Sequence, residues 1–499
     1  MTANQKKHNR EPGCASISAR VRLIGLWMGL LLLLALPVEA SRAGLGFHRA
    51  EIENPATPET TLSQQLFLPS IPQTVINPLP TIFGVEMFRL TETSGAQQMF
   101  AAGASWMRFS WGGVQWSQVE AQQGVYDWSA LSQLDNDLKI AAQHQVQTLV
   151  VVRSTPDWAQ QVPGAACGPI LADKLGAFAD FMYALVSRYR QAPYNIRYWE
   201  IWNEPDVAPD QVAPDSVWGC WGDPAAEYYG GRYFGEMLST IYPRIKEADP
   251  QAQVILGGLI LDCDPDNPPT GKDCSSSKFF EGVLRNGNGA NFDGVAFHAY
   301  DYYMGSLGNY FNPNWHSAWN TSGSVSNAKE EYLRNLLAKF GISGKFLMNT
   351  ENALLCDICA GNETFETTKA YYLTQAYGSA LTNGLEANIW HKVFDWRGSG
   401  LLNTDLSPRP AYTAFQFARR ELGDALYRRQ IVEYPGVKGF EFQRGSQLVW
   451  LVWSLDGDTH AISLPDTPLA VYDALGNPKA LSDKLSIDLT PYFIEFPAR

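Results

Sequence analysis

Between residues 81 and 424, short apolar runs alternate with longer stretches whose apolar positions recur every three or four residues. This alternation is typical of βα units and of a parallel sheet. The expected helices cover residues 129–144, 173–189, 225–248, 327–340 and 367–382. The expected strands cover residues 81–87, 106–110, 148–153, 196–202, 254–259, 294–298, 345–348 and 387–392. Eight strands with helices between them predict a (β/α)8 TIM barrel, a fold of the α/β class.

The loops expected after strands four, five and six are long, and they cover residues 205–232, 261–292 and 301–326. Loops that follow the strands of such a barrel all lie on its C-terminal face, where active sites are built. The extra length of the chain therefore predicts the walls of a substrate cleft.

From about residue 425 the pattern changes to short alternating segments, separated by Asp-Gly and Gly-Asn turns. These segments cover residues 439–443, 448–454, 461–464, 470–473 and 492–496. They predict a small antiparallel β-sandwich domain over residues 425–499. Its sequence supplies no cluster of titratable residues, so we expect a role in packing or carbohydrate affinity.

Residues 1–40 have the pattern of a secretory signal peptide. Five basic residues precede an apolar run over residues 23–36, and Val38-Glu39-Ala40 then offers a small-residue cleavage site. The run is shorter than the ~20 residues that a spanning helix needs, although an uncleaved membrane anchor is the alternative. Six prolines in residues 41–80 predict an extended linker. We therefore expect a secreted or extracytoplasmic protein, which the anchor would hold at the cell surface.

Export places the cysteines in an oxidising compartment, where disulfides persist. Six cysteines remain after the signal, and six cysteines allow fifteen pairings. Closeness in sequence favours Cys263 with Cys274 and Cys356 with Cys359, which leaves Cys167 with Cys220. The alternative is a zinc site on the C-D-I-C segment, which lacks a second Cys-x-x-Cys pair and a nearby histidine.

The composition is that of a folded globular protein with an acidic surface. Apolar residues make up 45% and charged residues 18% of the chain, and the net charge is −13. Residues 1–40 carry five basic and two acidic side chains, so their removal takes the net charge to −16. This charge argues against nucleic acid or an anionic membrane as a partner. The 16 Trp and 22 Tyr residues supply amphipathic rings suited to stacking on sugars.

The segment Y-W-E-I-W-N-E-P-D opens at Tyr198 as a strand-like run and stops at Pro205, which cannot donate to a sheet. Asn203 and Glu204 therefore fall where strand four gives way to a loop. This Asn-Glu-Pro, flanked by tryptophans, resembles strand four of glycoside hydrolase clan A, the retaining (β/α)8-barrel glycosidases. The resemblance implies that Glu204 is the general acid/base and that Asn203 binds the sugar 2-hydroxyl.

Cleavage of a glycosidic bond with retention needs a second carboxyl group about 5–5.5 Å from the first, ionised to attack the anomeric carbon. In the segment F-L-M-N-T-E-N, which begins at Phe346, a strand-like run again reaches a glutamate, Glu351. Within the resemblance, Glu351 matches the nucleophile of strand seven.

Arg108 closes strand two, and it resembles the clan's arginine beside the nucleophile, where a fixed cation lowers the pKa of a carboxyl group. An ordinary buried partner for Glu200 is an equal interpretation. His298 and Tyr300 on strand six resemble the clan's His-x-Tyr. There the tyrosine hydrogen-bonds the nucleophile and the histidine borders the acid/base.

Two tryptophans complete the expected site. Trp390 on strand eight resembles the platform under the sugar before the scissile bond, and the Thr-Pro-x-Trp segment that ends at Trp158 is similar to a segment of clan members. The resemblance covers residues 81–424. It is nearest to the β-xylosidase and α-iduronidase family or to cellulase-like members.

The sequence thus predicts a secreted retaining glycoside hydrolase that acts on a β-linked polysaccharide or oligosaccharide. No metal or cofactor is implied, and the oligomeric state stays open. A catalytically silent carbohydrate-binding barrel is the alternative from another class, because a fold alone does not establish activity. A transglycosylase would use the same residues.

Overall fold

The computed structural model describes residues 81–497, apart from residues 214–215, 217 and 360. The expected signal peptide (1–40) and linker (41–80) lie outside the described residues. In the described part of the chain, no helix has the length and apolar character needed to cross a membrane.

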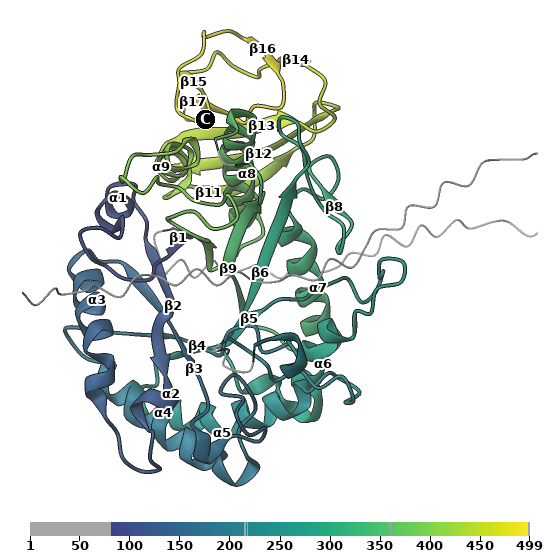
Figure 1. The fold of residues 1–499 in the computed structure, drawn as a ribbon. Helices are drawn as coiled ribbons and strands as arrows, with labels where there is room; N and C mark the ends of the chain where they lie inside the picture. The colour runs from purple at the N-terminus through teal and green to yellow at the C-terminus, as the bar shows by residue number, and fades with distance from the viewer. Residues whose placement is uncertain (1–80, 214–215, 217, 360, 498–499) are drawn as a thin grey trace, which may run out of the picture. The chain divides into compact units, whose positions relative to one another are not determined.

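Eight parallel strands close into a barrel, and Figure 1 shows helices arranged around it. The strands are β1 (Phe83–Glu86), β2 (Trp106–Gln115), β3 (Gln147–Arg153), β4 (Tyr198–Ile201), β5 (Gln253–Leu259), β6 (Gly294–Tyr303), β9 (Phe346–Leu355) and β10 (Ala387–Trp390). They pair in this order, and β10 pairs with β1 to close the ring. The predicted (β/α)8 barrel and its eight strands are confirmed.

The described helices follow the strands along the chain. They are α1 (Ala96–Ala101), α2 (Trp116–Val119), α3 (Ser132–Gln143), α4 (Leu175–Tyr189), α5 (Gly231–Ala248), α6 (Phe279–Leu284), α7 (Val325–Lys339), α8 (Glu363–Thr382) and α9 (Pro410–Leu422). The five expected helices correspond to α3, α4, α5, α7 and α8. Helix α9 is absent from the sequence prediction; it begins at a proline, which suits the first turn of a helix.

The interior of the barrel is filled in layers. One layer is apolar and takes side chains from seven strands: Trp106, Leu149, Tyr198, Ile255, Ala296, Met348, Ala387 and Ile389. Side chains along a strand alternate between two faces, so a step of two residues stays inside the barrel. That step leads from the apolar layer to Arg108, Glu200 and His298, all of which are buried. The period of the strands therefore places a charged layer directly on an apolar one.

Strand β9 contains a bulge that changes which side chains face inward. His298 of β6 pairs with Glu351, whereas the preceding Phe297 pairs with Asn349, so Thr350 is an extra residue. Such a bulge re-aims the side chains that follow it. Strand β9 also continues to Leu355 beside a long β6, so Glu351 lies within a strand. The sequence prediction, which ended this strand at residue 348, is wrong here because pairing with β6 extends it.

Beyond the barrel, β6 also pairs with a short antiparallel extension, β7 (Tyr310–Asn312) and β8 (Ser317–Ala318). The C-terminal part is a β-sandwich, as predicted. Its larger sheet has the order β11 (Leu426–Ile431), β12 (Val437–Arg444), β13 (Gln447–Ser454), β17 (Tyr492–Phe496) and β15 (Ala470–Asp473). Its smaller sheet pairs β14 (His460–Ser463) with β16 (Lys484–Ile487).

The two sheets of the sandwich share an apolar core to which the smaller sheet contributes Ile462 and Ile487. Other residues of the larger sheet pack against the barrel helices. The ring of Phe417 on α9 lies 5.3 Å from those of both Tyr472 and Phe493. Helix α9 therefore joins the barrel to the sandwich: Phe417 packs on the sandwich, whereas Phe415 packs on Phe83 and Tyr377 of the barrel.

Three disulfides cross-link the loops, and they join Cys167 with Cys220, Cys263 with Cys274, and Cys356 with Cys359. These are the pairs that closeness in sequence favours. Because the sulfurs of the C-D-I-C segment bond to each other, this segment does not form the alternative zinc site. The first disulfide ties the loop after β3 to the loop after β4.

Removal of the Cys167–Cys220 disulfide should cost more stability than removal of Cys356–Cys359. Their sequence separations are 53 and 3 residues. The entropy of loop closure then gives about 4 kcal/mol for the first and about 1.5 kcal/mol for the second. Double Cys→Ser variants of each pair, unfolded in guanidinium chloride, measure this difference. Equal losses for the two variants would contradict it.

Candidate active site

The functional side chains predicted from the sequence gather at the C-terminal ends of the barrel strands. Around them lie two residues absent from the prediction, Glu86 at the end of β1 and His391 just after β10. Hydrogen bonds and close contacts link the cluster, which consists of Glu86, Arg108, Glu200, Asn203, Glu204, His298, Tyr300, Glu351 and His391. All but Glu204 and Tyr300 are buried.

The backbone turns sharply where strand β4 delivers Asn203 and Glu204. Trp202 and Glu204 have φ angles of 72° and 51°, which residues other than glycine seldom adopt. The Glu204 N–H donates to the carbonyl of Gly258 at 2.9 Å, and this bond helps to hold the turn. The Glu204 side chain remains 22% exposed. Backbone strain of this kind is concentrated at functional sites.

His298 is the immediate partner of Glu204, with 2.8 Å between its Nδ1 and the Glu204 Oε1. Its ring lies against Gly258, where any Cβ would overlap it. Burial by itself would lower the pKa of His298, but the carboxylates of Glu351 and Glu204 outweigh burial and raise it. The histidine is thereby favoured as a proton donor toward Glu204.

Glu351 accepts hydrogen bonds from two sides. Arg108 Nη1 lies 2.6 Å from its Oε1, and the Tyr300 hydroxyl donates to its Oε2. Burial alone would raise the pKa of this carboxyl group, but His298, His391, Arg108 and the tyrosine hydroxyl hold it well below its usual range. Glu351 is therefore an ionised carboxylate, buried in the charged layer of the barrel interior.

Arg108 contacts both Glu351 and Glu200, the two partners that its sequence position suggests. Besides Glu351, it binds Glu200 through two nitrogens, at 2.7 and 3.0 Å. It also donates to Asn203 Oδ1 at 2.6 Å and to Glu86 at 3.1 Å. One planar guanidinium thus fixes four side chains from strands β1, β4 and β9 and from the turn after β4.

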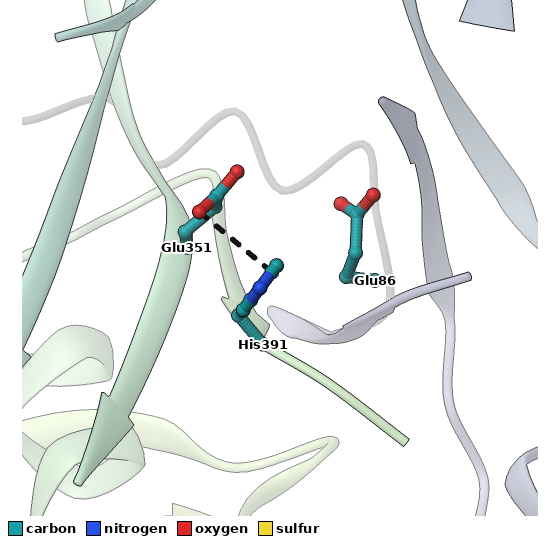
Figure 2. A group of neighbouring side chains, drawn as sticks. All are labelled: Glu86, Glu351 and His391. Carbon is teal, nitrogen blue, oxygen red and sulfur yellow. Dashed lines mark ion pairs between the residues drawn. The ribbon is translucent and has the colours of Figure 1, made fainter. Parts of the chain in front are cut away.

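Glu86 is the third carboxyl group in reach of this arginine. Figure 2 shows it across from Glu351 and His391, and one ligand atom from each of the three lies within 4.8 Å of the others. Burial raises the pKa of Glu86 to about 7, against the attraction of Arg108. The backbone and hydroxyl groups of Ser110 also donate to it. In the sequence, the only signal for Glu86 is an acidic residue at the end of an apolar strand.

His391 faces Glu351 from strand β10, with 3.7 Å between its Nδ1 and the Glu351 Oε2. Burial lowers the pKa of His391 to about 4, so its ring is neutral near pH 7. Among the described residues, neither this Nδ1 nor the Nε2 of His298 has a hydrogen-bond partner. Both nitrogens instead face the Glu351 carboxylate, His298 Nε2 at 3.6 Å and His391 Nδ1 at 3.7 Å.

The structure does not support Trp390 as the sugar platform. Its side chain is fully buried, and its indole N–H donates to the carbonyl of Ser399. Because side chains alternate along β10, His391 faces inward while Trp390 points toward Tyr372 on α8. The half-buried Trp396 instead lies beside His391 and Tyr300, with ring centroids 4.8 and 5.4 Å away.

Trp158 lies in the turn after β3. Its ring meets the edge of Trp116, and its indole N–H donates to the carbonyl of Glu120 at 3.0 Å. In the part of the chain that the structure describes, these contacts keep Trp158 outside the hydrogen-bonded cluster. Among the described residues, no contact between Trp158 and Glu204 or Glu351 supports the expectation that Trp158 binds substrate.

Two groups of side chains have the donor atoms that a metal ion could use: Glu86, Glu351 and His391, and Glu204, His298 and Glu351. In both groups, however, Arg108 and Tyr300 already bind the Glu351 carboxylate. A metal ion at either position would have to share the Glu351 carboxylate with these two donors.

In the second group, an oxygen of Glu204 and an oxygen of Glu351 lie within 4.8 Å of each other. The first carboxyl group is partly exposed and the second is buried and ionised. Two carboxyl groups that face each other in different environments are suited to acid and base roles.

Comparison with family models found no match, and no curated protein matches the sequence. Solved structures do match. A family 39 glycoside hydrolase from the gut symbiont Bacteroides cellulosilyticus WH2 aligns with a TM-score of 0.62 at 17% identity, over 84% of this chain and 81% of that one.

A GH30 endoxylanase from Clostridium papyrosolvens C71 aligns with a TM-score of 0.55 at 13% identity, over 84% of this chain and 97% of that one. A monomeric β-xylosidase from Caulobacter crescentus CB15 gives 0.54 and 16%, over 84% and 96%. At these identities the similarity establishes the fold. This is the fold that the resemblance to glycoside hydrolase clan A predicts.

Replacement of Arg108 should destabilise the protein far more than replacement of a surface arginine. Arg108→Met leaves Glu200 and Glu351 buried without their cation, which costs roughly 3–5 kcal/mol of unfolding free energy. Arg244 is the matched control, because it pairs with Glu247 and Asp180 while 35% exposed. Arg244→Met should cost at most about 1 kcal/mol. Denaturant unfolding of both variants tests this, and similar losses would contradict it.

Glu86 should make stability fall between pH 4.5 and 7. Its pKa rises from the ordinary 4.5 to about 7 on folding, so in this window the folded state binds the extra proton. Stability is fully present below pH 4.5 and declines, by up to roughly 3 kcal/mol, as pH rises through 7. Glu86→Gln removes this decline, so from pH 5 to 8 the variant should gain in melting temperature relative to the wild type.

The control for this comparison is Glu92→Gln, which changes an exposed glutamate. Its melting temperature should follow that of the wild type across the same pH range. Parallel curves for Glu86→Gln and the wild type would show that Glu86 ionises normally in the folded protein.

Proposed function

We propose that this protein is a retaining glycoside hydrolase that cleaves a β-linked polysaccharide or oligosaccharide by double displacement. The observation that carries the proposal is the close approach of Glu204 and Glu351, whose nearest ligand oxygens lie within 4.8 Å. Retaining enzymes hold their two carboxyl groups about 5–5.5 Å apart, whereas inverting enzymes need about 6.5–9.5 Å to admit a water molecule. The shorter separation supports retention.

Glu351 has the properties of the nucleophile. Arg108 and Tyr300 fix both of its oxygens, and its lowered pKa keeps it ionised near neutral pH. In the first step, a Glu351 oxygen attacks the anomeric carbon and the bond from that carbon to the leaving oxygen breaks. The negative charge of the carboxylate is consumed in the new ester bond.

Glu204 then acts as the acid in the first step and the base in the second. It gives its proton to the leaving oxygen as the bond breaks. A water molecule next attacks the anomeric carbon, its proton passes to Glu204, and Glu351 leaves as a carboxylate. The 2.8 Å contact with His298 holds the Glu204 side chain toward this position.

Asn203 is oriented for the sugar 2-hydroxyl. Its amide oxygen is occupied by Arg108 at 2.6 Å, which leaves the amide nitrogen as the donor. A hydrogen bond to this hydroxyl strengthens in the transition state and contributes several kcal/mol in such enzymes. The same arginine therefore positions both the nucleophile and the amide.

The structural neighbours suggest which substrates to test first. They include a β-xylosidase, an endoxylanase and a glucosidase. A panel of aryl β-glycosides and polysaccharides that starts from xylose and glucose would identify the sugar. Three disulfides and the predicted signal peptide support action outside the cytoplasm.

Two alternatives use the same fold. A silent carbohydrate-binding barrel would release no sugar from any member of the panel, but it has no need of an ionised Glu351 opposite Glu204. A transglycosylase would pass the glycosyl group to an added sugar in preference to water. Product analysis with and without acceptor sugars separates the three functions.

The roles of the two glutamates predict different products with azide. Glu204→Ala should still form the glycosyl-enzyme from an activated aryl glycoside, and azide should then give a product of retained configuration. Glu351→Ala should lose turnover, and azide could attack only from the opposite face, with inversion. The anomeric configuration of each glycosyl azide, determined by NMR, tests both assignments.

Glu227→Ala is the control, because this glutamate is 71% exposed, and its activity should equal that of the wild type. Interchanged configurations would reverse the two roles. Undiminished hydrolysis by either active-site variant would remove that glutamate from the mechanism.

A further inference from the structure

Three aromatic side chains, two of them exposed, form a row at the mouth of the barrel. Phe88 follows strand β1, Trp111 lies in β2, and Trp218 lies in the loop after β4. Phe88 is 56% and Trp111 43% exposed. The rings of Phe88 and Trp111 are 6.3 Å apart and those of Trp111 and Trp218 are 4.2 Å apart, both edge to face. We refer to these three residues as the aromatic row.

Two arginines contact rings of the aromatic row. The Arg153 guanidinium lies 5.5 Å from the Trp218 ring, and that of Arg89 lies 4.6 Å from the Phe88 ring. Trp218 is two residues from Cys220, which forms a disulfide with Cys167. Rings whose positions are fixed by such contacts lose little conformational freedom when they bind a ligand.

The aromatic row adjoins the proposed catalytic groups on two sides. Ser110, next to Trp111, donates to Glu86, which shares Arg108 with Glu351. Gly219, next to Trp218, packs so tightly on the backbone carbonyl of Glu204 that no Cβ fits. The loop with Trp218 therefore borders Glu204 directly.

A second group of rings lies on other strands. Tyr300 on β6 and His391 after β10 contact Glu351, and Trp396 lies beside both of their rings. That group borders the sugar which the nucleophile would attack. The aromatic row adjoins Glu204 through Gly219 and Glu86 through Ser110, so it lies next to the groups that would hold that sugar.

The chemistry of the aromatic row suits a sugar ring. Contiguous exposed apolar patches rimmed by polar groups mark binding sites. Aromatic faces cover the C–H face of a sugar, and this contact does not depend on the identity of the sugar's hydroxyl groups. A net charge of −13 also favours a neutral ligand over an anionic one.

We propose that the aromatic row binds a sugar unit of the substrate next to the one that reacts with Glu351. This proposal rests on the proposed function and deepens it, since it makes the substrate an oligosaccharide or polysaccharide. A chain of two or more sugar units would then span from the rings around Glu351 to the aromatic row.

The test compares two substrates of the same sugar, identified from the panel. One is the glycosyl fluoride, whose leaving group is too small to reach the aromatic row, and the other is an oligosaccharide of four or more units. Trp111→Ala and Trp218→Ala should each lower kcat/KM for the oligosaccharide at least tenfold. For the fluoride, kcat/KM should change less than twofold.

Tyr427→Ala is the matched control, because Tyr427 is an aromatic residue of the sandwich that is 40% exposed. It should leave both substrates unaffected. Equal losses on the fluoride and the oligosaccharide would show that the row merely supports the barrel. Unchanged kinetics on both would show that the row does not contact substrate. Either result overturns the proposal.

A binding measurement separates failure of this proposal from failure of the proposed function. In native gels that contain the polysaccharide, Glu351→Gln should be retarded, and the added Trp111→Ala should abolish the retardation. If the wild type hydrolyses nothing while this retardation persists, the proposed function fails and sugar binding by the row stands. A dimer that Trp111→Ala dissolves, without any retardation by polysaccharide, would make the row a contact between two copies and overturn the proposal.

Discussion

The site depends on one buried cation. Arg108 has no exposed side-chain surface, and it contacts carboxyl groups from strands β1, β4 and β9. Burial of a charge without a partner costs several kcal/mol of folding free energy. This cost applies to the guanidinium and equally to each carboxylate that it contacts. The guanidinium and its carboxyl groups therefore stabilise one another only when the barrel is closed. Because the guanidinium and these carboxyl groups must stay in contact, they fix the spacing of three strands and thereby the position of Glu351.

Backbone irregularities then aim the side chains. The extra residue Thr350 shifts the pairing of β9, so that both Thr350 and Glu351 contact interior groups. The left-handed conformation of Glu204 turns its carboxyl group out of the strand direction. Such features cost energy locally and persist because the surrounding structure determines them. The carboxyl groups meet because both strands depart from regular geometry.

Much of the fold followed from the sequence, because apolar period and strand length are local properties. The eight strands and the sandwich were predicted from these patterns, and the roles of Arg108 and Glu351 from their resemblance to the motifs of glycoside hydrolase clan A. Trp390 was misassigned because its motif does not say on which face of β10 the ring emerges. Glu86 and His391 carry no motif, and their importance arises from neighbours that are more than twenty residues away in the sequence.

The sequence by itself indicated the class of fold and favoured the disulfide pairs, because these depend on period and short separation. The two candidate carboxyl groups came from segments that resemble the motifs of glycoside hydrolase clan A. The tertiary structure alone decided that Glu86 joins Arg108, that His391 replaces Trp390 inside the barrel, and that the three rings of the aromatic row meet at its mouth. Burial and charge coupling act through space, so a pKa of about 7 for Glu86 exists only after the strands close around it.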